Sequence, residues 1–103
     1  MPTEVDSEKM EQIKNSEEPW VVDFWAEWCG PCQKLKPRFE EASEEIEDVN
    51  FGKVDMEENQ DLGTENGVRA LPTLVIFKGG EEVARHSGLM SKDELKEWIK
   101  DNT

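Results

Sequence analysis

The spacing of apolar residues along the chain follows two periods. Residues 31–47 carry an apolar side chain at every third or fourth position from Leu35 to Ile46, which predicts a helix with one buried face. Residues 20–25 form a nearly continuous apolar run, which predicts a strand covered on both faces of a sheet. The chain therefore combines helices with a buried strand, as α/β proteins do.

The remaining segments extend this alternation. Helices are expected at residues 6–16, at 59–66 and from Ser91 onward, and strands at 50–55, 73–78 and 81–87, with a short strand near residues 3–5. Gly79-Gly80 joins the last two strands and predicts a hairpin turn. We expect one α/β domain over residues 1–103, with a central mixed sheet of four to five strands flanked by four helices.

Acidic residues outnumber basic ones by 25 to 12, and the net charge is −13. Such a charge repels phosphate backbones and anionic lipids, so we expect neither a nucleic-acid nor a membrane partner. No run approaches the ~18 apolar residues of a membrane-spanning helix. The first residues lack the basic start and apolar run of a signal peptide, so we expect a cytoplasmic protein.

The acidic residues are concentrated in the second half of the helix predicted at 31–47. They are Glu40, Glu41, Glu44, Glu45, Glu47 and Asp48, whereas the basic residues Lys34, Lys36 and Arg38 occupy the first half. Three explanations remain open: a solvated face that aids solubility, adaptation to a salt-rich host, and selection of positively charged partners.

The two cysteines, Cys29 and Cys32, carry the clearest chemical signal. They lie where the strand at 20–25 leads into the next helix, and a helix N-terminus lowers the pKa of a thiol. A spacing of three residues lets the second thiol reach the first and resolve a mixed disulfide. A structural zinc site needs about four ligands. The only histidine is His86, so we expect no metal site.

Residues beside the cysteines fit this chemistry. Gly30 leaves room for another backbone to approach, and Pro31 has a φ angle suited to the first helical position. Asp23 interrupts the apolar strand, either as a proton acceptor for Cys32 or as a strand-edge or bulge residue that faces water. Lys53 on the next strand either pairs with this carboxylate or keeps a buried stem and a solvated head.

The segment Val22-Asp23-Phe24-Trp25-Ala26-Glu27-Trp28-Cys29-Gly30-Pro31-Cys32 resembles the signature of the thioredoxin family, and the similarity continues at residues 53–55, 67–69, 71–73 and 77–80. The resemblance implies the thioredoxin fold. It implies that Cys29 is the nucleophile, that Cys32 is the resolving thiol and that Asp23 is a buried proton-transfer group. It also implies a cis Leu71–Pro72 bond beside the disulfide.

A docking surface for substrates is implied as well. It would consist of Trp28, Gly30, Pro31, Ala70, Leu71 and Gly88. Two departures from the family pattern leave partner preference open: Gln33 follows the second cysteine where many relatives have lysine, and Ser87 replaces a common apolar docking residue.

The resemblance implies a protein-disulfide reductase that needs no cofactor beyond the redox-active disulfide Cys29–Cys32. Thioredoxin reductase would be its electron donor and disulfide-containing proteins its substrates, and we expect a monomer. Two alternatives remain: a thiol oxidase or isomerase, and a binding subunit on the same fold whose role is independent of redox chemistry. The Gly-Pro dipeptide between the cysteines favours the reductase.

Overall fold

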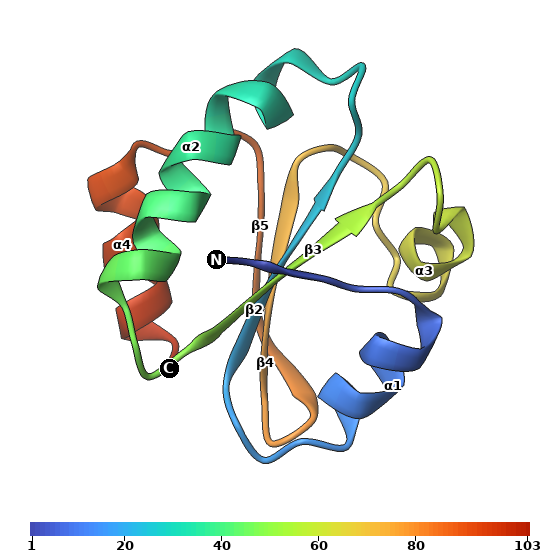
Figure 1. Cartoon of the computed structure of the whole chain (residues 1–103), viewed down its shortest axis with the longest axis horizontal. Coiled ribbons are helices and arrows are strands. Elements are labelled where there is room, and N and C mark those ends of the chain that lie inside the picture. Colours follow the sequence, from blue (N-terminus) through green and yellow to red (C-terminus); the bar gives the residue numbers. More distant parts are fainter.

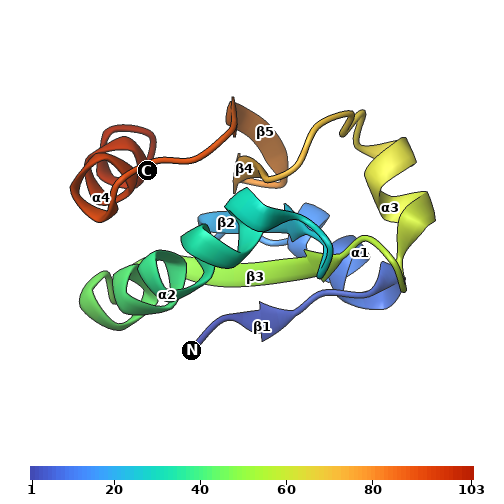
Figure 2. The ribbon, with the colours of Figure 1, turned by 90° about the horizontal axis from the view of Figure 1, so that it is seen from above.

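The computed structural model, which describes residues 1–103, contains one five-stranded sheet. The strands are β1 (Thr3–Glu4), β2 (Trp20–Trp25), β3 (Asn50–Asp55), β4 (Thr73–Lys78) and β5 (Glu81–Ser87). Their order is β1-β3-β2-β4-β5, and Figure 2 shows them side by side in this order. β1 and β2 run parallel to β3, whereas β4 is antiparallel to both β2 and β5. The predicted mixed sheet is confirmed.

Four helices cover the sheet. They are α1 (Ser7–Lys14), α2 (Gly30–Glu45), α3 (Gln60–Glu65) and α4 (Lys92–Asp101). Figure 1 shows α2 and α4 on one side of the sheet and α1 and α3 on the other. None of these helices is both long enough and apolar enough to cross a bilayer. The arrangement confirms the predicted α/β fold with helices on both faces.

The predicted helix boundaries were wrong by one to two residues. α1 begins after Asp6, because the Asp6 side chain accepts a hydrogen bond from the Lys9 N–H and caps the helix. α2 begins one residue earlier than predicted and ends two residues earlier. Ile46 adopts an extended backbone there, which directs its side chain into the core at 4% exposure.

Two hydrophobic clusters, one on each face of the sheet, follow from the alternation of side chains along the strands. Val21 packs in the cluster beneath α2 and α4, whereas Val22 and Phe24 pack in the cluster beneath α1 and α3. Asp23 is two residues from Val21, so it lies on the α2 face of the sheet. The same alternation that builds the core therefore directs a carboxylate toward the helix that begins with the cysteines.

α4 is fixed by its N-terminus and by one buried stripe. The helix begins with a capping box, in which Ser91 Oγ accepts from the Glu94 N–H and the Glu94 carboxylate accepts from the Ser91 N–H. Leu95 and Ile99 are fully buried. Trp98 is half-buried beside this stripe, with the centre of its ring 6.1 Å from that of the His86 ring.

Ion pairs join the acidic half of α2 to α4. Glu45 contacts Lys92 Nζ at 2.5 Å and Lys96 Nζ at 2.6 Å, and Glu41 lies 3.5 Å from Lys92 Nζ. Hydrogen bonds from the two lysines lower the pKa of Glu45 to about 2. Part of the acidic run is therefore paired across the helix interface, which none of the three explanations of the acidity included.

Replacing Glu45 by Gln should lower the free energy of unfolding at neutral pH. A carboxylate with a depressed pKa stabilises the fold above its unfolded pKa, so the difference from the parent should shrink as pH falls from about 4.5 to about 2. Urea unfolding across this range measures it. Glu44→Gln, which removes an exposed carboxylate without an ion pair, is the control. Equal effects of the two substitutions at every pH would contradict the ion-pair account.

Candidate active site

Cys29 and Cys32 form a disulfide at the start of α2. Cys29 is the N-cap residue of the helix, and the Cα atoms of the two cysteines are 5.2 Å apart. Both are buried, with Cys29 6% and Cys32 2% exposed. The expected position at a strand-to-helix junction is confirmed, and the first of the two cysteines is the more accessible.

The helix N-terminus favours negative charge on Cys29. The Cys32 N–H donates a hydrogen bond to Cys29 Sγ at 3.2 Å, so the sulfur fills the place of an N-cap oxygen. The first turn of α2 contains no acidic residue that would oppose a thiolate. The unpaired N–H groups and the helix dipole therefore stabilise the ionised form of this thiol.

Gly30 and Pro31 form the exposed surface of the first helical turn. A Cβ atom added at Gly30 would meet nothing within 4 Å, so the space in front of this backbone is open. Pro31 occupies the second helical position instead of the predicted first, because α2 begins at Gly30. The second position suits proline too, since its N–H would have no partner within the helix.

Asp23 is buried behind the disulfide, with 3% of its surface exposed. Its Oδ1 has no hydrogen-bond partner. Burial raises the pKa of Asp23 to about 7, and the positive charge of Lys53 lowers it in part. Of the two interpretations of Asp23, the strand-edge residue that faces water is therefore wrong.

Lys53 lies directly across from Asp23 in the β2–β3 pair. It acts on Asp23 through its charge and not through a hydrogen bond, and its Nζ lies 5.5 Å from the centre of the Trp25 ring. Both interpretations of this lysine are partly correct, because its charge reaches the carboxyl group while the side chain is only partly buried.

A narrow cavity connects the carboxyl group to the second cysteine. It measures about 10 Å³, room for about one water molecule. Its walls are formed by Asp23, Trp25, Cys32, Gln33, Lys36 and Lys53. Asp23 Oδ1 and Trp25 Nε1 are the two buried side-chain polar atoms without a partner, and both residues line this cavity. Sequence spacing gave no indication that Lys36 contributes to it.

An open groove lies beside the disulfide, between α3 and the segment that leads into β4. It is lined by Trp28, Met56, Glu57, Gln60, Val68, Arg69 and Leu71. Trp28 is 74% exposed, although large apolar side chains are usually buried. The backbone N–H and C=O of Leu71 form no hydrogen bond within the chain. The structure thus brings together two expected docking residues, Trp28 and Leu71.

Two further expected docking residues, Ala70 and Gly88, are held near Leu71. The Leu71–Pro72 bond is cis, as the resemblance implied. The Gly88 N–H donates to the Pro72 carbonyl at 2.9 Å, and Thr73 Oγ1 donates to the carbonyl of Ala70. Residues 70–73 and the end of β5 therefore form one connected surface.

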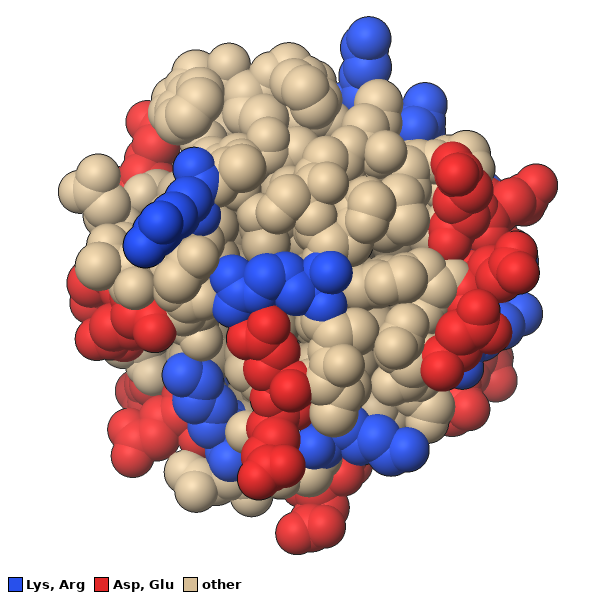
Figure 3. Space-filling view, turned by 180° about the vertical axis from the view of Figure 1, so that it is seen from behind, with Lys and Arg blue, Asp and Glu red and all other residues tan.

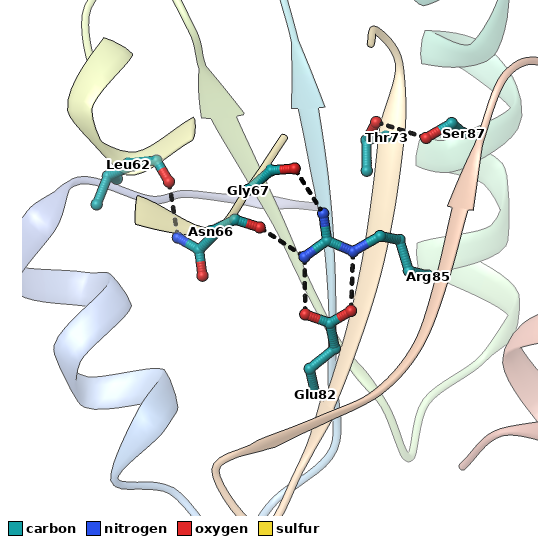
Figure 4. Close-up of polar contacts among 7 residues, drawn as sticks. All are labelled: Leu62, Asn66, Gly67, Thr73, Glu82, Arg85 and Ser87. Carbon is teal, nitrogen blue, oxygen red and sulfur yellow. Dashed lines mark hydrogen bonds and ion pairs between the residues drawn. The ribbon is translucent and has the colours of Figure 1, made fainter. Parts of the chain in front are cut away.

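Arg85 of β5 holds the loop that precedes this surface (Figure 4). Its guanidinium donates to the Asn66 carbonyl at 2.6 Å and to the Gly67 carbonyl at 3.2 Å, and it forms a bidentate pair with Glu82. This contact is not predictable from the sequence, since an arginine on an exposed strand carries no pattern that indicates its partner. Arg38 has a similar role, because it donates to the Met90 carbonyl at 2.7 Å.

Charge is unevenly distributed around the site. Figure 3 shows the molecule from behind, and the N-terminus of α2 lies at the top as it does in Figure 1. Acidic side chains gather along the sides and the lower part of this rear face. The upper centre of this face is largely uncharged.

No three or more His, Cys, Asp or Glu side chains are grouped so that they could hold a metal ion.

A disulfide at a helix N-terminus, beside a mixed sheet and a cis-proline loop, defines the class of thiol–disulfide oxidoreductases with this fold. The thioredoxin family model matches residues 2–101. Thioredoxin of Rickettsia bellii is 42% identical over 93 residues, which cover 89% of each chain. The chain therefore belongs to the thioredoxin family, whose members are disulfide oxidoreductases.

Solved structures agree with this assignment. A mutant thioredoxin from Halobacterium salinarum superposes with a TM-score of 0.90 at 39% identity, covering 99% of this chain and 90% of that one. Thioredoxin of Malassezia sympodialis gives 0.87 at 31% identity, with the same coverage of 99% and 90%. The chain thus has the thioredoxin fold along nearly its whole length.

Replacing Asp23 by Asn should stabilise the protein at alkaline pH. Because folding raises the pKa of Asp23 from 3.8 to about 7, the parent loses stability as pH rises through this interval, by an upper bound of roughly 4 kcal/mol. The variant should lack this loss. Urea unfolding of the oxidised protein between about pH 4 and pH 8 measures the difference. Asp48→Asn, at an exposed site, is the control; a gain independent of pH would refute the assignment.

Proposed function

We propose that this chain reduces protein disulfides with Cys29 as the nucleophile and Cys32 as the resolving thiol. The observation that carries the proposal is the position of Cys29 Sγ at the N-terminus of α2, where it accepts the Cys32 N–H. Cys29 is also the more exposed of the two cysteines, as an attacking thiolate must be.

The reaction proceeds by two thiol–disulfide exchanges. The Cys29 thiolate attacks one sulfur of the substrate disulfide, forms a mixed disulfide and releases the other sulfur as a thiolate. Cys32, after losing its proton, attacks Cys29 Sγ and releases the second substrate thiolate. The substrate gains two electrons, and the chain is left with the Cys29–Cys32 disulfide.

Asp23 accepts the proton of Cys32 in the second step. A pKa of about 7 lets this carboxylate take up and return a proton near neutral pH. The cavity that both residues line has room for about one water molecule, which would carry the proton between them. Lys53 and Lys36, also in the cavity wall, favour negative charge there, and Lys53 keeps the pKa from rising further.

Substrates dock as an extended segment on the surface beside the disulfide. The free N–H and C=O of Leu71 can pair with a substrate backbone as a neighbouring strand would. Trp28 provides apolar contact, while Gly30 and Pro31 keep the approach to Cys29 open. Pro72, Ala70 and Gly88 complete the surface by holding Leu71 next to the disulfide.

The oxidised chain must then be reduced again by a partner. We assign this role to thioredoxin reductase, and place the chain in the cytoplasm as a monomer that uses no bound cofactor. The net charge of −13 supports protein partners over nucleic acids or anionic membranes.

Replacing Cys32 by Ser should trap the mixed disulfide. With the resolving thiol absent, the reaction stops after the first exchange, and mass spectrometry should detect substrate bound covalently through Cys29. Cys29→Ser should form no adduct and reduce no substrate. Trapping through Cys32 in the Cys29→Ser variant, at the parent rate, would reverse the assigned roles.

The midpoint potential of the disulfide should lie near the roughly −270 mV of thioredoxins. Titration in dithiothreitol buffers at neutral pH, followed by the fluorescence of the neighbouring Trp28, measures it. A potential near −180 mV or higher is typical of isomerases and oxidases. Such a value would overturn the assignment as a reductase and support the alternative of an oxidase or isomerase.

A further inference from the structure

Ser87 ends β5 at the border of the docking surface. It lies opposite Thr73 in the antiparallel β4–β5 pair, so the two side chains share one face of the sheet. The next residue, Gly88, donates its N–H to the Pro72 carbonyl. Ser87 is exposed, so its hydroxyl group is within reach of a molecule docked along residues 70–72.

The hydroxyl proton of Ser87 has a defined direction. Thr73 Oγ1 bonds to the Ala70 carbonyl and lies 2.9 Å from Ser87 Oγ (Figure 4). A carbonyl oxygen carries no proton, so Thr73 uses its single proton in the bond to Ala70. The Ser87 hydroxyl must therefore donate to Thr73. The chain of hydrogen bonds runs from Ser87 to Thr73 to Ala70.

This direction leaves Ser87 as an acceptor only. Its proton is held by Thr73, while no other hydrogen bond within the chain uses the remaining lone-pair capacity of Ser87 Oγ, and the residue is exposed. Donation to a second hydroxyl group strengthens the acceptor by polarisation. A substrate N–H or O–H can donate a hydrogen bond to Ser87 Oγ. An apolar substrate side chain that covers Oγ instead displaces the water bound there and leaves the oxygen without a donor.

We propose that Ser87 determines substrate specificity by selecting disulfides that carry a hydrogen-bond donor beside the reactive cysteine. The proposal rests on the docking surface assigned above. It concerns the choice of substrate only, since Ser87 touches neither sulfur nor Asp23 in the contacts of the structure. An apolar residue at this position would remove the selection.

Paired peptides test the proposal. The two disulfide peptides of each pair differ at one residue, which is Thr in one peptide and Val in the other, two side chains of similar shape. Different pairs place this residue at each of two positions on either side of the reactive cysteine. Single-turnover rate constants are measured with the reduced protein from the fluorescence change of Trp28. At one of these positions the parent should react about 2- to 10-fold faster with the Thr peptide, the range expected for one hydrogen bond.

Variants at Ser87 should change this ratio alone. Ser87→Ala should make the two rates equal, because the Thr peptide loses its hydrogen bond and the Val peptide no longer covers an unpaired acceptor. Ser87→Thr, which keeps the hydroxyl group, should restore the preference. The midpoint potential should be the same in all three proteins. Ser7→Ala, at an exposed serine on α1, is the matched control and should keep the parent ratio.

Three results would overturn the proposal: equal rates for the paired peptides with the parent, a preference for Thr that survives in Ser87→Ala, or equal slowing of both peptides by this variant. If the parent reduced neither peptide, the proposed reductase function itself would fail. Reduction of both peptides at one rate would leave that function intact and remove only the role of Ser87.

Discussion

The packing of α2 against the sheet is the interaction on which the active site depends. The helix is held by its buried face, where Leu35 and Phe39 are fully enclosed and the Phe39 ring lies 5.2 Å from that of Phe51. The packing of this buried face fixes the axis of α2. It therefore also fixes the direction in which the N–H groups at the helix N-terminus point. Cys29 and Cys32 receive their electrostatic environment from this terminus. The apolar stripe of the sequence thus sets the chemistry of residues that lie outside it.

Asp23 shows that the same packing includes a feature that opposes stability. Its carboxyl group lies on the α2 face of the sheet, with one oxygen unpartnered, and its pKa is raised to about 7 by burial. A leucine or valine there would pack without this penalty, as Val21 does two residues earlier. The raised pKa is also what makes the group able to exchange a proton near neutral pH. Stability and the proposed proton transfer therefore place opposite demands on this position.

The order of elements and the cysteine site were predictable because local patterns carry them. Periodic apolar residues predicted α2 and β2, and the dipeptide Gly79-Gly80 predicted the hairpin. Contacts between residues far apart in sequence were not predictable, since nothing near Arg85 indicates that it reaches the carbonyls of the loop before β4. The pairing of Glu45 with two lysines of α4 is another long-range contact that was not predictable. Residue spacing describes one element at a time, whereas these contacts depend on how elements meet.

The distribution of charge connects stability to recognition. With a net charge of −13, the chain repels acidic molecules, but at an ionic strength of about 0.1 M salt largely screens this repulsion beyond about 10 Å. Close to the disulfide, Lys36 and Lys53 line the cavity beside Cys32 together with Asp23, and the groove beside Trp28 contains both Arg69 and Glu57. Charges of both signs would therefore act on a segment that docks there, and the net charge of the chain alone does not set the field that it meets. Under the proposed function, short-range contacts, including the hydrogen bonds proposed for Leu71 and Ser87, would then decide among the partners that reach the surface.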